Sequence, residues 1–206
     1  MVSPVLSDRD RARIRDAVAA AEKTTAGEIF TVVARSSDDY RFVPLFWATI
    51  VALLVPLPLI FLTRIGVLDI YLIQLVVFLA AATVLSLPAL RFPAVPGPMK
   101  KARAHAAAVE QFLAHGLHMT EARTGVLVFV SLAERYAEIV ADAGIAAKVA
   151  QPVWDEAIAA LTREIAAGRL ADGLVAAIGR AGAVLAEHFP PRPRDRNELA
   201  NDVVLI

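Results

Sequence analysis

The sequence contains no cysteine, so it has neither a disulfide framework nor the thiolate ligands of the usual structural zinc sites. Its 21 basic and 21 acidic side chains cancel to a formal net charge of zero. A neutral chain lacks the broad positive field with which nucleic-acid-binding proteins attract phosphates. These absences exclude a disulfide scaffold and predict that no nucleic acid is a partner.

Familiar catalytic motifs are also missing. The sequence contains no GxSxG, GxxxxGK[ST], GxGxxG or HExxH motif, which removes the signals of serine hydrolases, P-loop proteins, dinucleotide-binding proteins and zinc proteases. His115 and His118 are three residues apart rather than the four that place two zinc ligands on one helix face. The motif scan therefore identifies no catalytic constellation.

Hydrophobic residues make up 57% of the chain, and many of them lie in two blocks that carry no charge. Residues 42–62 and 70–90 each contain 21 residues, about the number that a helix needs to cross a ~30 Å hydrocarbon core. The intervening residues 63–69 suffice only for a tight turn. The sequence predicts a two-helix transmembrane hairpin over residues 42–90, and the charged first forty residues do not resemble a signal peptide.

The polar residues and prolines within the two blocks indicate an anchor rather than a transporter. Pro56 and Pro58 predict a kink or an early helix end in the first span. Gln74 interrupts the second span, where we expect it to hydrogen-bond to a neighbouring helix. Neither span contains an ionisable group, and two helices alone cannot enclose a pathway.

Basic residues flank the hairpin asymmetrically. Arg41 precedes the first span, and Arg91, Lys100, Lys101 and Arg103 follow the second, against Arg64 in the turn. Because basic flanks favour the cytoplasmic side, we expect an integral membrane protein with two spans, both termini in the cytoplasm and the lipid bilayer as its first partner.

The segments on either side of the hairpin, residues 1–41 and 91–189, read as two parts of one domain. The first predicts a helix over 8–23, with Ser7 as its N-cap, and a strand over 28–34. The second predicts a helix over 100–117, strands over 126–130 and 136–142, and helices from 144 to 168 and from 170 to 188. This order predicts an α/β fold in which 28–34 lies beside 126–130. Residues 190–206 form a tail rich in proline and arginine, and its segment 197–206 is expected to add a short strand or packing segment.

Several segments resemble the TPM domain family, in its small membrane-anchored branch. They are TTAGEIFTVV (24–33), RTGVLVFVSLAERYAEIVADAGI (123–145), GRLADGL (168–174) and NELANDVVLI (197–206). The resemblance implies an α/β/α sandwich. It also implies one of two activities, because some TPM domains are described as acid phosphatases or metal-binding proteins and others as assembly factors of membrane complexes.

The resemblance directs attention to carboxylates near the second predicted hairpin strand. Asp142 follows that strand, where TPM domains place acidic groups, and it is the candidate catalytic residue. Asp142, Glu138 and Asp155 are the candidate ligands of Mg²⁺ or Ca²⁺, cations that prefer oxygen ligands. Glu28 and Glu134 are further carboxylates, and Asp142 can equally serve as a loop cap.

Two functions from different classes follow. The leading hypothesis is a non-catalytic or weakly catalytic interaction and assembly module that binds other membrane-protein subunits. The alternative is a metal-dependent acid-type phosphatase acting at the membrane surface. Convergent carboxylates in a polar cleft would favour the enzyme, and an exposed apolar surface would favour the module.

Overall fold

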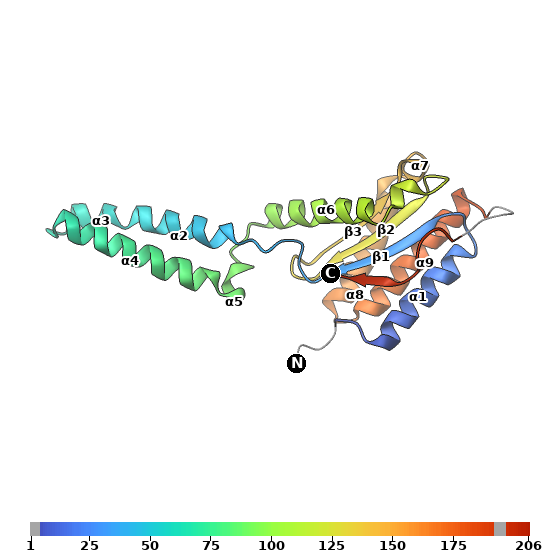
Figure 1. Ribbon diagram of the computed structural model, residues 1–206, viewed down its shortest axis with the longest axis horizontal. Helices are drawn as coiled ribbons and strands as arrows, with labels where there is room; N and C mark the ends of the chain where they lie inside the picture. Colours follow the sequence, from blue (N-terminus) through green and yellow to red (C-terminus); the bar gives the residue numbers. More distant parts are fainter. Residues whose placement is uncertain (1–4, 192–196) are drawn as a thin grey trace. The chain divides into compact units, whose positions relative to one another are not determined.

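A computed structural model describes residues 5–191 and 197–206 of the chain. The chain forms two compact units, one made of Met1–Ser37 with Arg103–Ile206 and the other of Asp38–Ala102. The first unit is a mixed α/β domain with a four-stranded sheet (Figure 1). The predicted α/β class is confirmed.

The sheet joins segments from both sides of the hairpin. Its strands are β1 (Glu28–Ala34), β2 (Gly125–Ser131), β3 (Tyr136–Ala141) and β4 (Val203–Leu205), in the order β3-β2-β1-β4. β1 pairs in parallel with β2 over its whole length, and β2 forms an antiparallel hairpin with β3. The predicted pairing of residues 28–34 with 126–130 is therefore confirmed.

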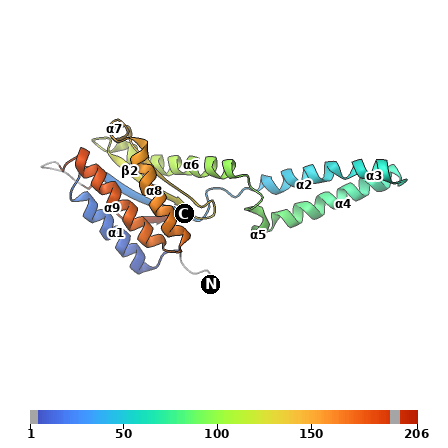
Figure 2. The same ribbon diagram turned by 180° about the vertical axis from the view of Figure 1, so that it is seen from behind.

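Helices cover both faces of this sheet (Figures 1 and 2). One face packs against α1 (Asp8–Glu22), α8 (Gln151–Ala166) and α9 (Leu170–His188) through a core that includes Ile14, Val18, Ile29, Val128, Trp154, Leu161 and Ile178. The other face packs against α6 (Gly97–Ala114), whose Ala108 and Phe112 contact a cluster with Phe30, Val32 and Phe129. All seven residues of β1 are buried, and successive side chains enter opposite cores, as expected for a strand with both faces covered.

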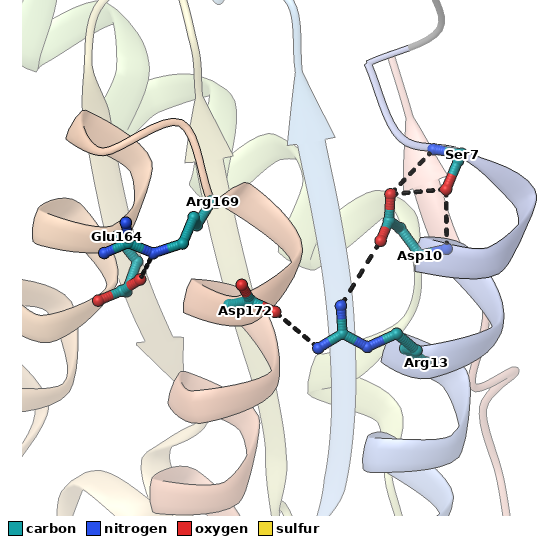
Figure 3. A network of polar contacts seen from close by, with 6 residues as sticks. All are labelled: Ser7, Asp10, Arg13, Glu164, Arg169 and Asp172. Atoms are coloured by element: carbon teal, nitrogen blue, oxygen red, sulfur yellow. Dashed lines mark hydrogen bonds and ion pairs between the residues drawn. The ribbon is translucent and has the colours of Figure 1, made fainter.

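The start of α1 and the α8–α9 turn carry a network of polar contacts, drawn in Figure 3. Ser7 Oγ accepts a hydrogen bond from the Asp10 backbone N–H at 3.1 Å, and Asp10 accepts one from Ser7, which confirms the predicted N-cap. Arg13 Nη2 lies 2.6 Å from Asp172 Oδ1 and joins α1 to α9. Arg169 Nε lies 2.6 Å from Glu164 Oε2 at the turn between α8 and α9. The side chains of the ion pairs are between about a third and a half exposed, so each pair adds little to stability and mainly fixes orientation.

The contact between α1 and α9 depends on a glycine. A Cβ atom built on Gly182 would lie 2.6 Å from the Cβ atom of Ala21. Real carbon atoms do not approach so closely, so the absence of a side chain at Gly182 lets the two helices pack at this distance.

The second unit contains α2 (Phe42–Leu54), α3 (Pro56–Leu62), α4 (Val67–Ser86) and α5 (Pro88–Arg91). α2 and α3 meet at Val55, before Pro56, as the prolines predicted. The predicted limits 70–90 of the second apolar helix need correction, because α4 starts at Val67 and ends at Ser86. At the start of α4, Gly66 is extended and Asp69 lies in the first turn, where a negative charge interacts favourably with the helix dipole. At its end, Leu87 is extended because it precedes Pro88.

Aromatic side chains gather at one end of this unit. Tyr40 and Val43 pack with Val95, and the Tyr40 ring meets the Phe92 ring edge-on at 5.9 Å. Trp47 Nε1 donates a hydrogen bond to the Ala94 carbonyl at 3.1 Å. These contacts tie the start of α2 to the segment that follows α5.

Three smaller elements complete the chain. The 3₁₀ turn η1 (Leu117–Met119) precedes β2, and α7 (Ala143–Ala146) precedes α8. The helix expected from 144 to 168 is therefore two helices, α7 and α8. Most of the tail's proline- and arginine-rich part, residues 192–196, lies outside the described residues, while the expected short strand near the C-terminus is β4.

Candidate functional site

A polar pocket of about 390 Å³ lies where α1 ends and β1 begins. Its walls come from three segments that are distant in sequence, namely α1, the loop into β1, and the chain before β4. The polar residues that line it are Glu22, Lys23, Thr25, Glu28, Asn197 and Asn201. We refer to it as the Glu22–Glu28 pocket.

Glu22 accepts a backbone hydrogen bond at the edge of the sheet. Its Oε1 accepts a hydrogen bond from the Ile29 backbone N–H at 3.0 Å. β4 pairs with β1 only at Thr31–Val33, so the Glu22 carboxylate takes the place of a strand partner for Ile29. Its second oxygen, Oε2, accepts a hydrogen bond from Asn201 Nδ2 at 2.6 Å.

Glu28, the first residue of β1, is only 6% exposed. Its Oε1 accepts a hydrogen bond from the Glu198 backbone N–H at 3.1 Å. Both carboxylates of the pocket therefore hold the C-terminal segment that leads into β4.

Burial and the neighbouring carboxylate of the pocket change the pKa of Glu22. The pKa of Glu22 is raised from 4.5 to about 7, chiefly by burial and also by the nearby charge of Glu28, while the hydrogen bonds from Ile29 and Asn201 lower it. Near neutral pH, both the protonated and the ionised form of Glu22 are therefore populated. Such a carboxyl group can give or take a proton at physiological pH.

Asp142, the predicted catalytic residue, is a helix cap in the structure. Its Oδ1 accepts a hydrogen bond from the Ala143 backbone N–H at 2.6 Å, at the start of α7, and lies 4.0 Å from Arg123 Nη1. Asp142 is 6% exposed, and its Oδ2 is buried without a hydrogen-bond partner in the described part of the chain. The capping alternative thus describes its contacts, and a catalytic role stays a prediction.

Glu138 and Asp155, the other candidate metal ligands, have separate partners. Glu138 accepts a hydrogen bond from the Tyr136 hydroxyl at 2.9 Å and lies 2.9 Å from His105 Nδ1. Burial, with the hydrogen bond to Glu138, raises the pKa of Tyr136. Asp155 accepts a hydrogen bond from Gln151 Nε2 within α8.

The structure does not bring the three predicted ligands together. Across residues 5–191 and 197–206, no group of three or more His, Cys, Asp or Glu side chains is placed to hold a metal ion. Mg²⁺ and Ca²⁺ take at least six oxygen ligands, several of them usually carboxylate or water. The described side chains do not fit such a centre, and metal binding by Asp142, Glu138 and Asp155 stays a prediction.

Glu134 lies in the turn between β2 and β3 and binds the chain that leaves β1. It accepts hydrogen bonds from Ser36 Oγ and from the Ser37 backbone N–H, each at 3.1 Å, and from Ser131 Oγ. Ser37 Oγ in turn donates to Ser131 Oγ at 2.8 Å. This cluster fixes residues 36–37, immediately before the chain enters the second unit.

Sequence reasoning singled out Glu28 but missed Glu22 and Asn201. Glu22 is one of several charged residues on an amphipathic helix, and nothing local marks it as buried. Asn201 lies in a segment whose pairing with β1 depends on the folded sheet. A covariation between these two positions is the signal that could have revealed the pocket.

Comparisons with known proteins support the fold. Residues 84–184 match the family described as the TPM domain. This range contains α6, β2, β3, α8 and most of α9, while α1, β1 and β4 of the same unit lie outside it.

A solved structure resembles the whole chain. The NMR structure of BA42 protein from the psychrophilic bacterium Bizionia argentinensis is 21% identical, with a TM-score of 0.62, and the match covers 100% of this chain and 99% of that one. At this identity the likeness shows a shared fold alone. No curated protein matches the sequence.

Proposed function

We propose that this protein inserts in a membrane through two spans, holds a TPM-like α/β domain at the membrane surface, and serves as an interaction and assembly module for other membrane-protein subunits. The observation that carries the proposal is the exposed apolar surface of the second unit. Phe61 and Leu62 are each 81% exposed and Val67 is 86% exposed. Water would make such a surface costly, whereas lipid covers it.

The burial of the two helices supports insertion in lipid. The most apolar windows of 42–62 and 67–86 have mean hydropathies of 2.5 and 2.2, yet only 11% and 0% of their residues are buried. An apolar core helix of a water-soluble domain would instead be mostly buried. Both helices are also long enough to cross the hydrocarbon core.

The two ends of the hairpin differ in the way that membrane orientation requires. Tyr40 and Trp47, aromatic residues typical of membrane interfaces, lie near one end together with Arg41 and Arg91. The other end, between α3 and α4, contributes Arg64. This distribution favours cytoplasmic termini.

The contacts of the carboxylates favour a module over an enzyme. Glu134 holds the exit from β1, Glu22 and Glu28 hold the C-terminal segment, and Asp142 caps α7. Each of them accepts a backbone or side-chain hydrogen bond that builds the fold. These contacts support a structural role for the four carboxylates.

Cross-linking in native membranes tests this proposal. We expect the full-length protein to stay in the membrane pellet after an alkaline carbonate wash. After cross-linking, it should be recovered covalently joined to a second membrane protein at reproducible lysines, such as Lys100 or Lys101, which are absent from a Lys100→Ala, Lys101→Ala control. Release by carbonate would contradict the membrane anchor, and recovery of uncross-linked protein alone would contradict the assembly role.

The Glu22–Glu28 pocket favours hydrolysis of phosphomonoesters as a second candidate function. Glu22, whose pKa is raised to about 7, can protonate a leaving group near neutral pH. Purified protein should then hydrolyse p-nitrophenyl phosphate, tested with and without Mg²⁺ or Ca²⁺, and Glu22→Gln should remove most of the activity. Asp142→Asn tests the residue predicted from the sequence in the same assay. An inactive wild type between pH 5 and 8 would contradict this function.

A further inference from the structure

A groove lined mainly by apolar surface lies between the two apolar helices of the hairpin. It has a volume of about 190 Å³ and is lined by Thr49 and Ala52 of α2 and by Tyr71, Gln74 and Phe78 of α4, among others. Thr49 Oγ1 already donates to the Leu45 carbonyl of its own helix at 2.8 Å. The half-buried Gln74 has no hydrogen bond to any described residue. The interhelical hydrogen bond expected for Gln74 is therefore not formed among the described residues of a single chain.

The position of Gln74 makes this open amide costly. Gln74 is seven residues along α4 from Val67, or about 10 Å at 1.5 Å per residue, and therefore well inside a ~30 Å hydrocarbon core. Its amide has two donor hydrogens and one acceptor oxygen. Lipid tails satisfy none of them, so the group favours a partner on another helix.

We propose that two copies of this chain associate in the membrane through this groove, with their Gln74 amides hydrogen-bonded to each other. The inference rests on the membrane insertion in the proposed function and names one partner of the hairpin. A primary amide is self-complementary, because the donor of one copy meets the acceptor of the other across a two-fold axis. Identical chains also place Gln74 at the same depth, which a different partner would have to match by its own sequence.

The residues around Gln74 suit a helix–helix contact. Ala52 is only 5% exposed, whereas Leu75, 42% exposed, offers apolar surface next to the amide. Neither span carries Asp, Glu, Lys, Arg or His between 42 and 62 or between 70 and 86, so the polar contacts of this part of the hairpin come from neutral groups such as the Gln74 amide.

The absence of cysteine allows a direct test with the full-length protein in native membranes. Leu75→Cys places a thiol at the groove, and Val76→Cys, at a position 65% exposed on the other side of α4, is the matched control. Copper phenanthroline oxidises two neighbouring thiols to a disulfide. We expect disulfide-linked homodimers from Leu75→Cys, verified with two differently tagged copies, and at least ten-fold fewer from Val76→Cys.

Replacing the amide tests its role within the same variant. Gln74→Leu added to Leu75→Cys should lower dimer formation about 3- to 30-fold, the effect of an interhelical hydrogen bond in a bilayer. Gln74→Asn, which keeps an amide, should restore a substantial part of it. Three outcomes would overturn the self-association while leaving the membrane anchor intact. Leu75→Cys could resist carbonate but remain monomeric, it could cross-link only to a different protein, or Gln74→Leu could have no effect on dimer formation. Release of the protein by carbonate would overturn both proposals.

Discussion

The side-chain amide of Asn201 donates a hydrogen bond to Glu22 Oε2 over 2.6 Å, between residues that are 179 positions apart in the sequence. This bond attaches the segment before β4 to the end of α1. Because Glu22 also binds the Ile29 backbone N–H, the ionisation of one carboxyl group is coupled to the attachment of the C-terminal strand.

The first prediction is that the α/β domain loses stability as the pH rises from about 4.5 to about 7. The folded-state pKa of Glu22 is raised to about 7, so in this window the folded chain keeps a proton that the unfolded chain has lost. The contribution of Glu22 is therefore fully present below pH 4.5 and is lost as the pH rises through 7. One proton limits the slope to about 1.4 kcal/mol per pH unit.

Thermal unfolding followed by circular dichroism at several pH values measures this effect. Glu22→Gln should flatten the profile between pH 4.5 and 7, while Glu156→Gln, at an exposed position of α8, should leave it as in the wild type. Identical profiles for wild type and Glu22→Gln would show that Glu22 does not titrate in this range.

The second prediction compares two glycines of α9. Gly182→Ala places a methyl group 2.6 Å from Ala21 Cβ, so the helices must separate, and we expect a loss of about 1–3 kcal/mol in the free energy of unfolding. Gly179→Ala meets nothing within 4 Å and should stabilise the helix by about 0.5–1 kcal/mol. Denaturant unfolding of both variants gives the comparison, and equal changes would contradict the close contact between α1 and α9.

The third prediction concerns the serine cluster around Glu134. Glu134→Ala removes the acceptor of Ser36, Ser37 and Ser131 and leaves donors partly buried, so we expect a loss of about 1–3 kcal/mol. Hydrogen exchange followed by mass spectrometry should show faster exchange at residues 34–37. The exposed Glu187→Ala serves as control, and unchanged exchange at Ser37 would argue against the anchoring role.

The fourth prediction is the orientation of the hairpin. A cysteine introduced at Gly66, between the apolar helices, should react with a membrane-impermeant maleimide on intact cells. A cysteine at the exposed Ala106 of α6 should react only after the membrane is opened. The reverse pattern would place the α/β domain outside the cytoplasm.

The fifth prediction is that neither sequence fragment of the α/β domain is sufficient. β1 lies between β2 and β4, so residues 91–206 alone lack the strand that joins β4 to the β2–β3 hairpin. A chain in which 1–41 and 91–206 are connected by a short linker should therefore melt at a higher temperature than 91–206. Equal melting temperatures would contradict the split domain.

The sequence by itself determined the elements whose signals are local. Residues 28–34 are a strand and 170–188 a helix at the predicted limits, because β-branched runs and helical periodicity act through neighbouring residues. Ser7 caps α1 as expected, since a cap needs only three following residues. The two uncharged blocks likewise predicted the apolar helices.

Only the tertiary structure decided which side chains meet. The start of α4 at Val67 and the splitting of the expected 144–168 helix changed predicted limits by a few residues, but the Glu22–Glu28 pocket could not be read at all. Its two carboxylates and Asn201 come from α1, β1 and the segment before β4. They become neighbours because β1 pairs in parallel with both β2 and β4, and burial in the folded domain, rather than residue type, raises the pKa of Glu22.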